Sequence, residues 1–270
     1  MTNPEWLRLV SEYQRAVIRL FRGRLTNLVL HPEITETPEF RLEAETIGRR
    51  MAASVAKANV GTWRGAVMRK TNAREMYRAL QAEIAAGGYG PDLIALARRN
   101  AELIRSLPRE IGEMATQRAT RMAQESGRAG DLERFIRKLV PDVAKTRIKL
   151  IARTEVSRAN TDLTQGRSER LGIEWAQWIT SEDQRVRPSH RNLDKVLMRW
   201  DDPPQPEALI GEKSTLGPGL GGKFPNCRCD MLPLASIDEI SWPARCYMNG
   251  SIRRIGRAEF VNAFGVRLAA

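Results

Sequence analysis

Two short segments hold most of the side chains in this sequence that could do unusual chemistry. Cys227 and Cys229 lie in the segment Phe-Pro-Asn-Cys-Arg-Cys-Asp, and His190 ends the segment Asp-Gln-Arg-Val-Arg-Pro-Ser-His. Two thiolates and an imidazole are ligand types that tetrahedral zinc sites use. These three residues are therefore the candidate ligands if the protein holds zinc.

The details of the two segments nevertheless lead us to expect no bound metal or other cofactor. The Cys-x-Cys spacing differs from the usual Cys-x-x-Cys, and Arg187 stands where another ligand could be. A fourth ligand would have to be Asp183, Asp230 or a water molecule. In the alternative interpretation, the two cysteines fill apolar space at the edge of a strand and the histidine orders a loop.

Signatures of common enzyme classes are missing. The sequence has no Walker-type phosphate loop, no dinucleotide fingerprint and no His-Glu-x-x-His pair. A nuclease of the His-Asn-His type would have more than one histidine near its metal, and this region has one. We predict a protein that is not an enzyme. The alternative is a metal-dependent nuclease or other enzyme built on His190, Cys227 and Cys229, including a Cys227 nucleophile with His190 as base.

The composition is that of a folded globular protein. Hydrophobic residues make up 42% of the 270 residues and charged residues 28%, which are ordinary values. No apolar run approaches the roughly 18 residues of a membrane-spanning helix, and the first residues lack the features of a secretion signal. Three cysteines do not form a disulfide framework, so we expect synthesis in a reducing cytoplasm and no membrane partner.

The charge of the chain predicts a polyanionic partner. Lys and Arg number 44 against 32 Asp and Glu, which gives a net charge of +12. Arginine binds phosphate and carboxylate through two parallel hydrogen bonds. Double-stranded DNA, bound without sequence preference, is the simplest partner. In the alternative, the arginines pair with carboxylates of this protein or of a partner.

The elements that must position these residues begin with a helical region. Helix-start signals at Asn3 and Thr37 and apolar residues at helical spacing predict helices up to Pro141. The predicted helices cover residues 3–24, 38–55, two stretches between 71 and 107 divided by Gly87 to Pro91, 111–122, and a short one at 132–139 that Pro141 ends. His31 is expected on a surface loop, without a function.

A long helix from about Asp142 to Leu171 follows, and it carries a carboxylate on its apolar face. Glu155 shares one stripe with Ile148 and Ala159. A carboxylate that faces a core needs a partner. We expect Glu155 to form an ion pair that locks the core, with Arg158 one turn on, or Arg185 and Arg187 across the fold, as candidates.

The pattern changes after Gly172 to short strands and loops. Strands are predicted at 173–179, 196–200 and 229–234, because β-branched and aromatic residues gather there. A polar turn at 183–188, a helical turn at 190–193 and a long irregular loop at 201–222 lie between them. The last segment, 241–270, reads as a basic appendage with a short helix at 257–264.

Together these elements predict an α+β protein with a mostly helical N-terminal region and a small mixed α/β module that has a short sheet and a long irregular loop. The predicted parts are a helical region at 1–141, a module at 142–240 and a basic C-terminal tail at 241–270.

Three blocks of the module, in their order, resemble the phage Mu F-like head morphogenesis family, over about Val143 to Leu234. The blocks are Ile-Ala-Arg-Thr-Glu with Arg-Ala-Asn after it, Trp178 before Asp-Gln-Arg-Val-Arg-Pro-Ser-His, and Phe-Pro-Asn-Cys-Arg-Cys. Many members have Cys-Pro-x-Cys where this chain has Arg-Pro-Ser-His, so a complete four-cysteine zinc site is not expected. The motif residues are Arg153, Thr154, Glu155, Asp183, Arg185, Arg187, His190, Pro225, Asn226, Cys227, Arg228 and Cys229.

The resemblance implies a minor capsid protein of a tailed phage or prophage. Such a protein is made in the host cytoplasm and lies inside the capsid near the portal vertex, where it acts in head assembly and in DNA packaging or ejection. Its implied partners are the portal protein and major capsid or scaffold proteins, and no catalytic residue is implied. Arg153 and Glu155 should hold the module together, while Pro225 to Cys229 should fix the loop against the sheet. A non-virion DNA-binding protein is the remaining alternative.

Overall fold

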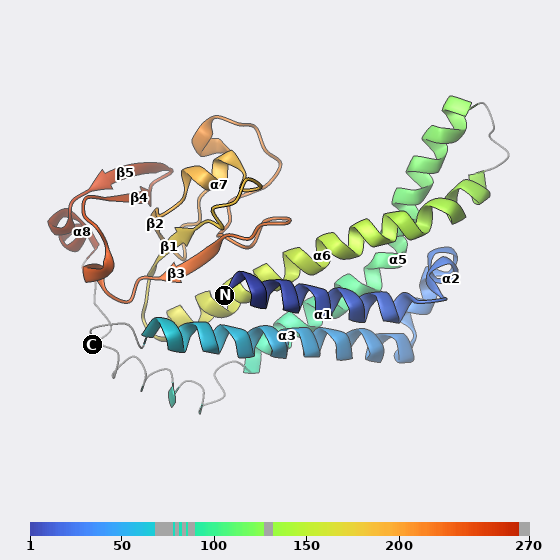
Figure 1. The fold of residues 1–270 in the computed structure, drawn as a ribbon, viewed down its shortest axis with the longest axis horizontal. Helices are drawn as coiled ribbons and strands as arrows, with labels where there is room; N and C mark the ends of the chain where they lie inside the picture. The colour runs from blue at the N-terminus through green and yellow to red at the C-terminus, as the bar shows by residue number, and fades with distance from the viewer. Residues whose placement is uncertain (68–77, 79–80, 83–84, 86–89, 127–131, 265–270) are drawn as a thin grey trace. The chain divides into compact units, whose positions relative to one another are not determined.

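A computed structural model describes residues 1–67, 78, 81–82, 85, 90–126 and 132–264, and its first half is helical as predicted (Figure 1). Among the described residues, no helix combines the length and the apolar character needed to cross a membrane. The helices of this half are α1 (Asn3–Phe21), α2 (Leu25–Leu30), the 3-10 helix η1 (Pro32–Glu36), α3 (Pro38–Val67), α5 (Gly90–Ser126) and α6 (Leu132–Arg170).

Two predicted helix breaks are wrong, because Pro108 lies inside α5 and Pro141 inside α6. Leu107 and Ile111 are fully buried on either side of the first proline, and Val140 is fully buried beside the second. Packing of a continuous apolar stripe therefore outweighs the backbone hydrogen bond that each proline removes. The helix expected in the first part of 71–107 falls outside the described residues, apart from isolated positions.

The chain divides into two compact units, and helices α3 and α6 contribute residues to both. One unit comprises Pro4–Ser54 with Leu93–Arg153. Its core includes Tyr13, whose hydroxyl donates a hydrogen bond of 2.9 Å to the buried Asn100 side chain. His31 is exposed in the loop between α2 and η1, as expected.

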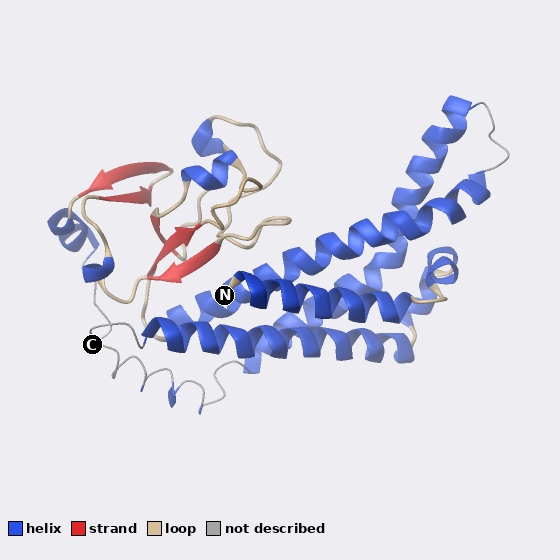
Figure 2. Cartoon of the chain, in the orientation of Figure 1, coloured by secondary structure: helices blue, strands red, loops and turns tan. Residues whose placement is uncertain are grey.

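The other unit comprises Met1–Asn3, Val55–Asp92 and Thr154–Ala270, and it contains a five-stranded mixed sheet. The strand order is β3-β1-β2-β4-β5, with β2 and β4 parallel and the other neighbours antiparallel (Figure 2). The predicted α+β class and the three predicted strands are confirmed. The strands are β1 (Trp175–Ile179), β2 (Leu197–Arg199), β3 (Asp230–Pro233), β4 (Ala244–Met248) and β5 (Ser251–Ile255).

Residues 244–264 are not an appendage, contrary to the sequence-based expectation. Strands β4 and β5 extend the sheet, and α8 (Arg257–Phe264) follows them. Phe260 is fully buried, and its ring meets that of Trp175 on β1 edge-on at 4.8 Å. The last helix therefore completes one face of the sheet. Whether 1–141, 142–240 and 241–270 fold separately stays a prediction.

The other face of the sheet carries the candidate site. Trp178 from β1 and Met231 from β3 are buried there with Phe224 from the preceding loop. The short helix α7 (Pro188–Asn192) and the 3-10 helix η3 (Ala208–Ile210) belong to the same part of the chain. The predicted long loop is thus irregular but largely packed, because Leu220 is buried and Leu209 and Leu216 pack against this cluster.

Candidate metal centre

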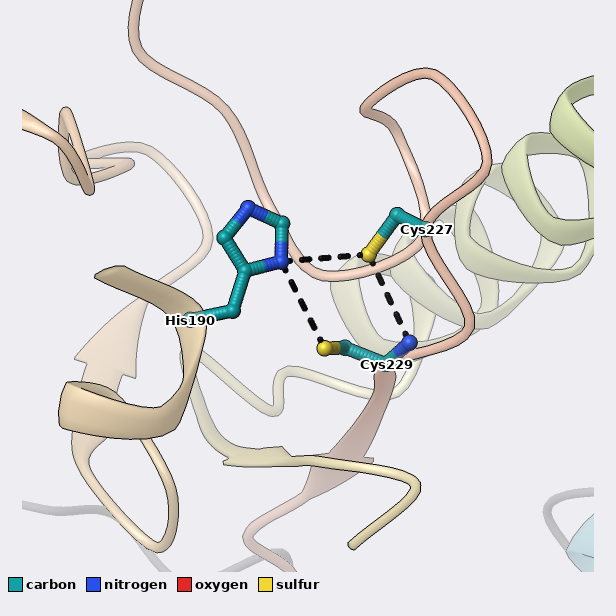
Figure 3. Close-up of side chains that lie close together, drawn as sticks. All are labelled: His190, Cys227 and Cys229. Atoms are coloured by element: carbon teal, nitrogen blue, oxygen red, sulfur yellow. Dashed lines mark hydrogen bonds between the residues drawn. The ribbon is translucent and has the colours of Figure 1, made fainter. Parts of the chain in front are cut away.

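His190, Cys227 and Cys229 converge beside the sheet, as Figure 3 shows. The Nδ1 atom of His190 lies 3.4 Å from Sγ of Cys227 and 3.6 Å from Sγ of Cys229. One ligand atom from each residue can be chosen so that all three lie within 4.8 Å of one another. Helix α7 supplies the histidine, and the segment before β3 supplies both cysteines. The fold therefore brings His190 next to two cysteines that lie 37 and 39 positions later in the sequence.

The surroundings of this cluster are apolar and closed. His190 is 2% exposed, Cys227 6% and Cys229 7%. The rings of Trp178 and Phe224 meet the imidazole edge-on, at 5.2 Å and 5.0 Å between centroids. The Nε2 atom of His190 is buried and has no hydrogen-bond partner in the described part of the chain. A substrate larger than a metal ion or a water molecule therefore has little access.

The two cysteines differ in acidity. The hydrogen bond with Cys229 and the neighbouring His190 lower the pKa of Cys227, although burial acts in the opposite direction. The backbone N–H groups of Gly222 and Cys229 also donate to the Cys227 sulfur, at 3.3 Å and 3.4 Å. The hydrogen bond with Cys227 and burial raise the pKa of Cys229. One thiolate beside a thiol and an imidazole is an arrangement that a soft cation can bind.

The aspartates considered as a fourth ligand have other partners. Asp183 forms an ion pair with Arg228, and its Oδ1 atom accepts the backbone N–H of Arg185 at 2.9 Å. Asp230 accepts a hydrogen bond of 3.0 Å from Asn160. Within the described residues, neither carboxylate joins the cluster of potential ligands. The cluster offers three protein ligands, which leaves the fourth position of a tetrahedral ion to water.

The segment that carries the cysteines is tied to α6 and α7 through its backbone. Thr154 accepts the backbone N–H of Asn226 at 3.1 Å, and Arg187 donates to the carbonyl of Pro225 at 2.9 Å. Asn226 has φ of 55°, a left-handed conformation that asparagine adopts more readily than most residues. Arg187 therefore fixes the loop through this hydrogen bond. It does not supply the additional metal ligand that another residue type could provide at this position.

Further along α6, two more side chains bind the backbone of the segment that precedes the cysteines. Thr161 donates to the carbonyl of Gly221 at 2.7 Å, and Arg158 donates to the carbonyl of Lys223 at 2.9 Å. Gly222 has φ of +86°, and a Cβ atom there would lie 2.4 Å from the Thr161 hydroxyl oxygen. Sequence reasoning missed Thr161 and Gly222. Thr161 follows Thr154 by seven residues and so lies on the same helix face, which was an available signal.

The carboxylate of Glu155 is buried and pairs with Arg158 at 3.5 Å, the nearer of the expected partners. Arg185 is exposed and Arg187 is half-buried. Arg153 is half-buried, and no hydrogen bond or ion pair of its side chain is found in the part of the chain that the structure describes. The structure thus places Glu155 in a pair within α6, while the role of Arg153 stays a prediction.

Comparison with known proteins agrees with the resemblance that the three sequence blocks of the module indicated. The sequence pattern described as "Phage Mu protein F like protein" matches residues 63–232, which include the whole candidate centre and all of α6. An uncharacterized protein of Haemophilus influenzae is 32% identical over 148 residues, which cover 54% of this chain and 30% of that protein. No solved structure matches the chain.

Proposed function

Because the chain belongs to the phage Mu protein F-like family, we propose that it is a minor head protein that enters the virion near the portal vertex. In this role it acts in head assembly and in the packaging or ejection of DNA. The family match over residues 63–232 is the observation that carries this proposal.

The construction of the module supports a structural role. Hydrogen bonds from Asn226, Thr161 and Arg158 connect α6 with the loop that carries the cysteines. The cluster that could have been catalytic is almost fully buried. A catalytic group must be accessible to the substrate on which it acts. We therefore propose that His190, Cys227 and Cys229 stabilise the fold rather than turn over a substrate.

The charge of the chain supports contact with packaged DNA. A net charge of +12 favours binding of phosphate without sequence preference. A protein inside the head lies beside a concentrated polyanion, so an excess of arginine reduces electrostatic repulsion there. The proposed partners are therefore double-stranded DNA, the portal protein, and major capsid or scaffold proteins.

Association with the portal is tested by co-expression. The portal protein of the same phage or prophage is expressed with an affinity tag together with this chain. The tagged portal protein should retain the chain during washing in moderate salt, and the chain should sediment with the portal ring. An unrelated ring-forming protein with the same tag, expressed in the same way, is the control for nonspecific retention. Release of the chain from the portal, with no co-sedimentation, would contradict the portal assignment.

The geometry of the cysteine cluster favours one second role, the binding of a structural zinc ion. Three ligand atoms of suitable type lie within 4.8 Å of one another at buried positions. Zinc bound there would link α7 to the segment before β3, and its binding energy would add to the stability of the fold. This role is compatible with a head protein and does not require catalysis.

A further inference from the structure

A cavity of about 590 Å³ opens on the face of the sheet that also carries α7. Asn192 at the end of α7, Leu209 of η3 and residues of β4 and β5 line it. This cavity is separate from the buried cysteine cluster, since neither cysteine nor His190 lines it. Its lining from β4 and β5 lies beyond residue 232, where the family match ends.

The lining of the cavity is strongly basic. Arg245, Arg253 and Arg254 contribute to it, and no aspartate or glutamate does. Arg253 and Arg254 are exposed and form no ion pair with any described residue. Arg254 lies on the same face of the sheet as Arg245, whereas Arg253, which pairs with Cys246, belongs to the opposite face. Two guanidinium groups with no carboxylate among the lining residues favour an anionic ligand, because each planar group can donate two parallel hydrogen bonds to a phosphate.

Arg245 is held in place within this cavity. Its Nη2 atom donates to the backbone carbonyl of Asn192 at 2.6 Å and to the Asn192 side-chain oxygen at 3.1 Å. Both bonds use the same nitrogen, so the other guanidinium nitrogens are left to a ligand. A group that is already fixed loses less conformational entropy when it binds.

The register of β4 and β5 places two of these arginines opposite each other. Arg245 pairs with Arg254 across the antiparallel ladder, and directly opposed residues point to the same face of a sheet. Like charges in this position destabilise the sheet. Charged residues on an edge strand can also prevent unwanted strand pairing, but this explanation does not cover Arg245, which lies on the inner strand β4. A bound anion between the two arginines would relieve their repulsion.

We propose that this cavity is a binding site for the phosphate backbone of double-stranded DNA, with Arg245 and Arg254 as the phosphate-contacting residues. This inference rests on the DNA binding in the proposed function and assigns that binding to specific residues. Duplex DNA is preferred to an acidic protein segment because the site offers forked guanidinium donors, with Arg245 held in place and Arg254 exposed to solvent. These features match single phosphate groups that repeat along a backbone.

The test measures binding of a short fluorescent duplex of arbitrary sequence by anisotropy over a series of salt concentrations. Arg254→Ala should weaken binding several-fold and reduce the slope of log K against log salt by about 1. Arg15→Ala, which removes an exposed arginine of α1 in the other compact unit, should change both quantities less.

The variant Arg254→Glu separates binding from folding. It replaces the repulsion with Arg245 by attraction, so the thermal unfolding midpoint should rise while DNA affinity falls below that of Arg254→Ala. Equal effects of the Arg254 and Arg15 substitutions would overturn the cavity as the site, even if the wild-type chain binds DNA. Displacement of the duplex by poly-glutamate at concentrations where competitor DNA is ineffective would overturn DNA as the ligand. Failure of the wild-type chain to bind DNA would do the same, whereas incorporation into particles tests the head-protein role separately.

Discussion

The hydroxyl oxygen of Thr154 accepts the backbone N–H of Asn226 at 3.1 Å, although 72 residues separate them in the sequence. This bond joins the long helix α6 to the segment that carries both cysteines of the candidate centre. Thr154 is 9% exposed, so water does not readily replace its hydroxyl group. The bond therefore fixes the position of the loop relative to the helix.

Removal of this acceptor should destabilise the fold. In Thr154→Val the shape of the side chain is kept, but the Asn226 N–H loses its partner, at a cost of about 1–3 kcal/mol in the free energy of unfolding. Thr154→Ser keeps the hydroxyl group and should cost less. Urea unfolding of both variants measures the difference, and a larger loss for Thr154→Ser than for Thr154→Val would show that the methyl group, not the hydrogen bond, matters at this position.

Gly222 should tolerate no side chain. Its φ of +86° disfavours any L-residue, and an added Cβ atom would lie 2.4 Å from the Thr161 hydroxyl oxygen and 3.1 Å from the Ser157 carbonyl oxygen. Gly250→Ala is the matched control, because Gly250 has φ of +78° and nothing within 4 Å of the added Cβ atom. We expect a loss of about 1–2 kcal/mol for Gly250→Ala, from backbone conformation alone, and a clearly larger loss for Gly222→Ala. Similar unfolding midpoints for the two variants would contradict the close approach of helix and loop.

Zinc should bind at the cysteine cluster in a ratio of one ion per chain. The measurement is elemental analysis of protein purified without chelator, followed by thermal unfolding with and without a chelator. Cys227→Ala and His190→Ala should lose the ion, and Cys246→Ala should keep it, since Cys246 lies on β4 and is not among the clustered ligands. Folded wild-type protein without zinc would leave the three residues as a hydrogen-bonded packing cluster.

Cys246 should make stability sensitive to alkaline pH. Burial, with the nearby Glu259 carboxylate, raises the pKa of this thiol to about 12. In the unfolded chain the thiol ionises near pH 9, so between about pH 9 and pH 12 the unfolded state binds fewer protons and the free energy of unfolding decreases. Comparison of urea unfolding at about pH 8 and about pH 10.5 should therefore show a larger decrease for wild type than for Cys246→Ala. Parallel decreases in the two proteins would contradict this account.

Local sequence signals predicted the elements whose packing follows from their own pattern. Asn3 with Pro4 and Glu5 marks the start of α1, and the tryptophans of β1 mark the central strand. Pro141 was misleading because tertiary packing kept α6 continuous through it. Strands β4 and β5 were missed because arginines interrupt their apolar alternation, as in Arg253 and Arg254 on the edge strand.

The candidate site shows the same division between local and long-range information. The sequence places Cys227 beside Cys229, and their meeting with His190 follows from the fold. The contact of Gly222 with Thr161 depends on the path of a loop over a helix, and no pattern within either segment specifies that path. Likewise, the pairing of Arg245 with Arg254 requires the register of β4 and β5.

The most direct test of the central claim is quantitative mass spectrometry of DNA-filled phage particles from an induced culture of the source strain, after nuclease treatment and sedimentation. The ratio of this chain to portal and major capsid protein is measured with labelled reference peptides. The account predicts that the chain is present at low copy number relative to the major capsid protein and sediments with the portal. Its absence from well-formed, DNA-filled particles would contradict a virion role for this protein.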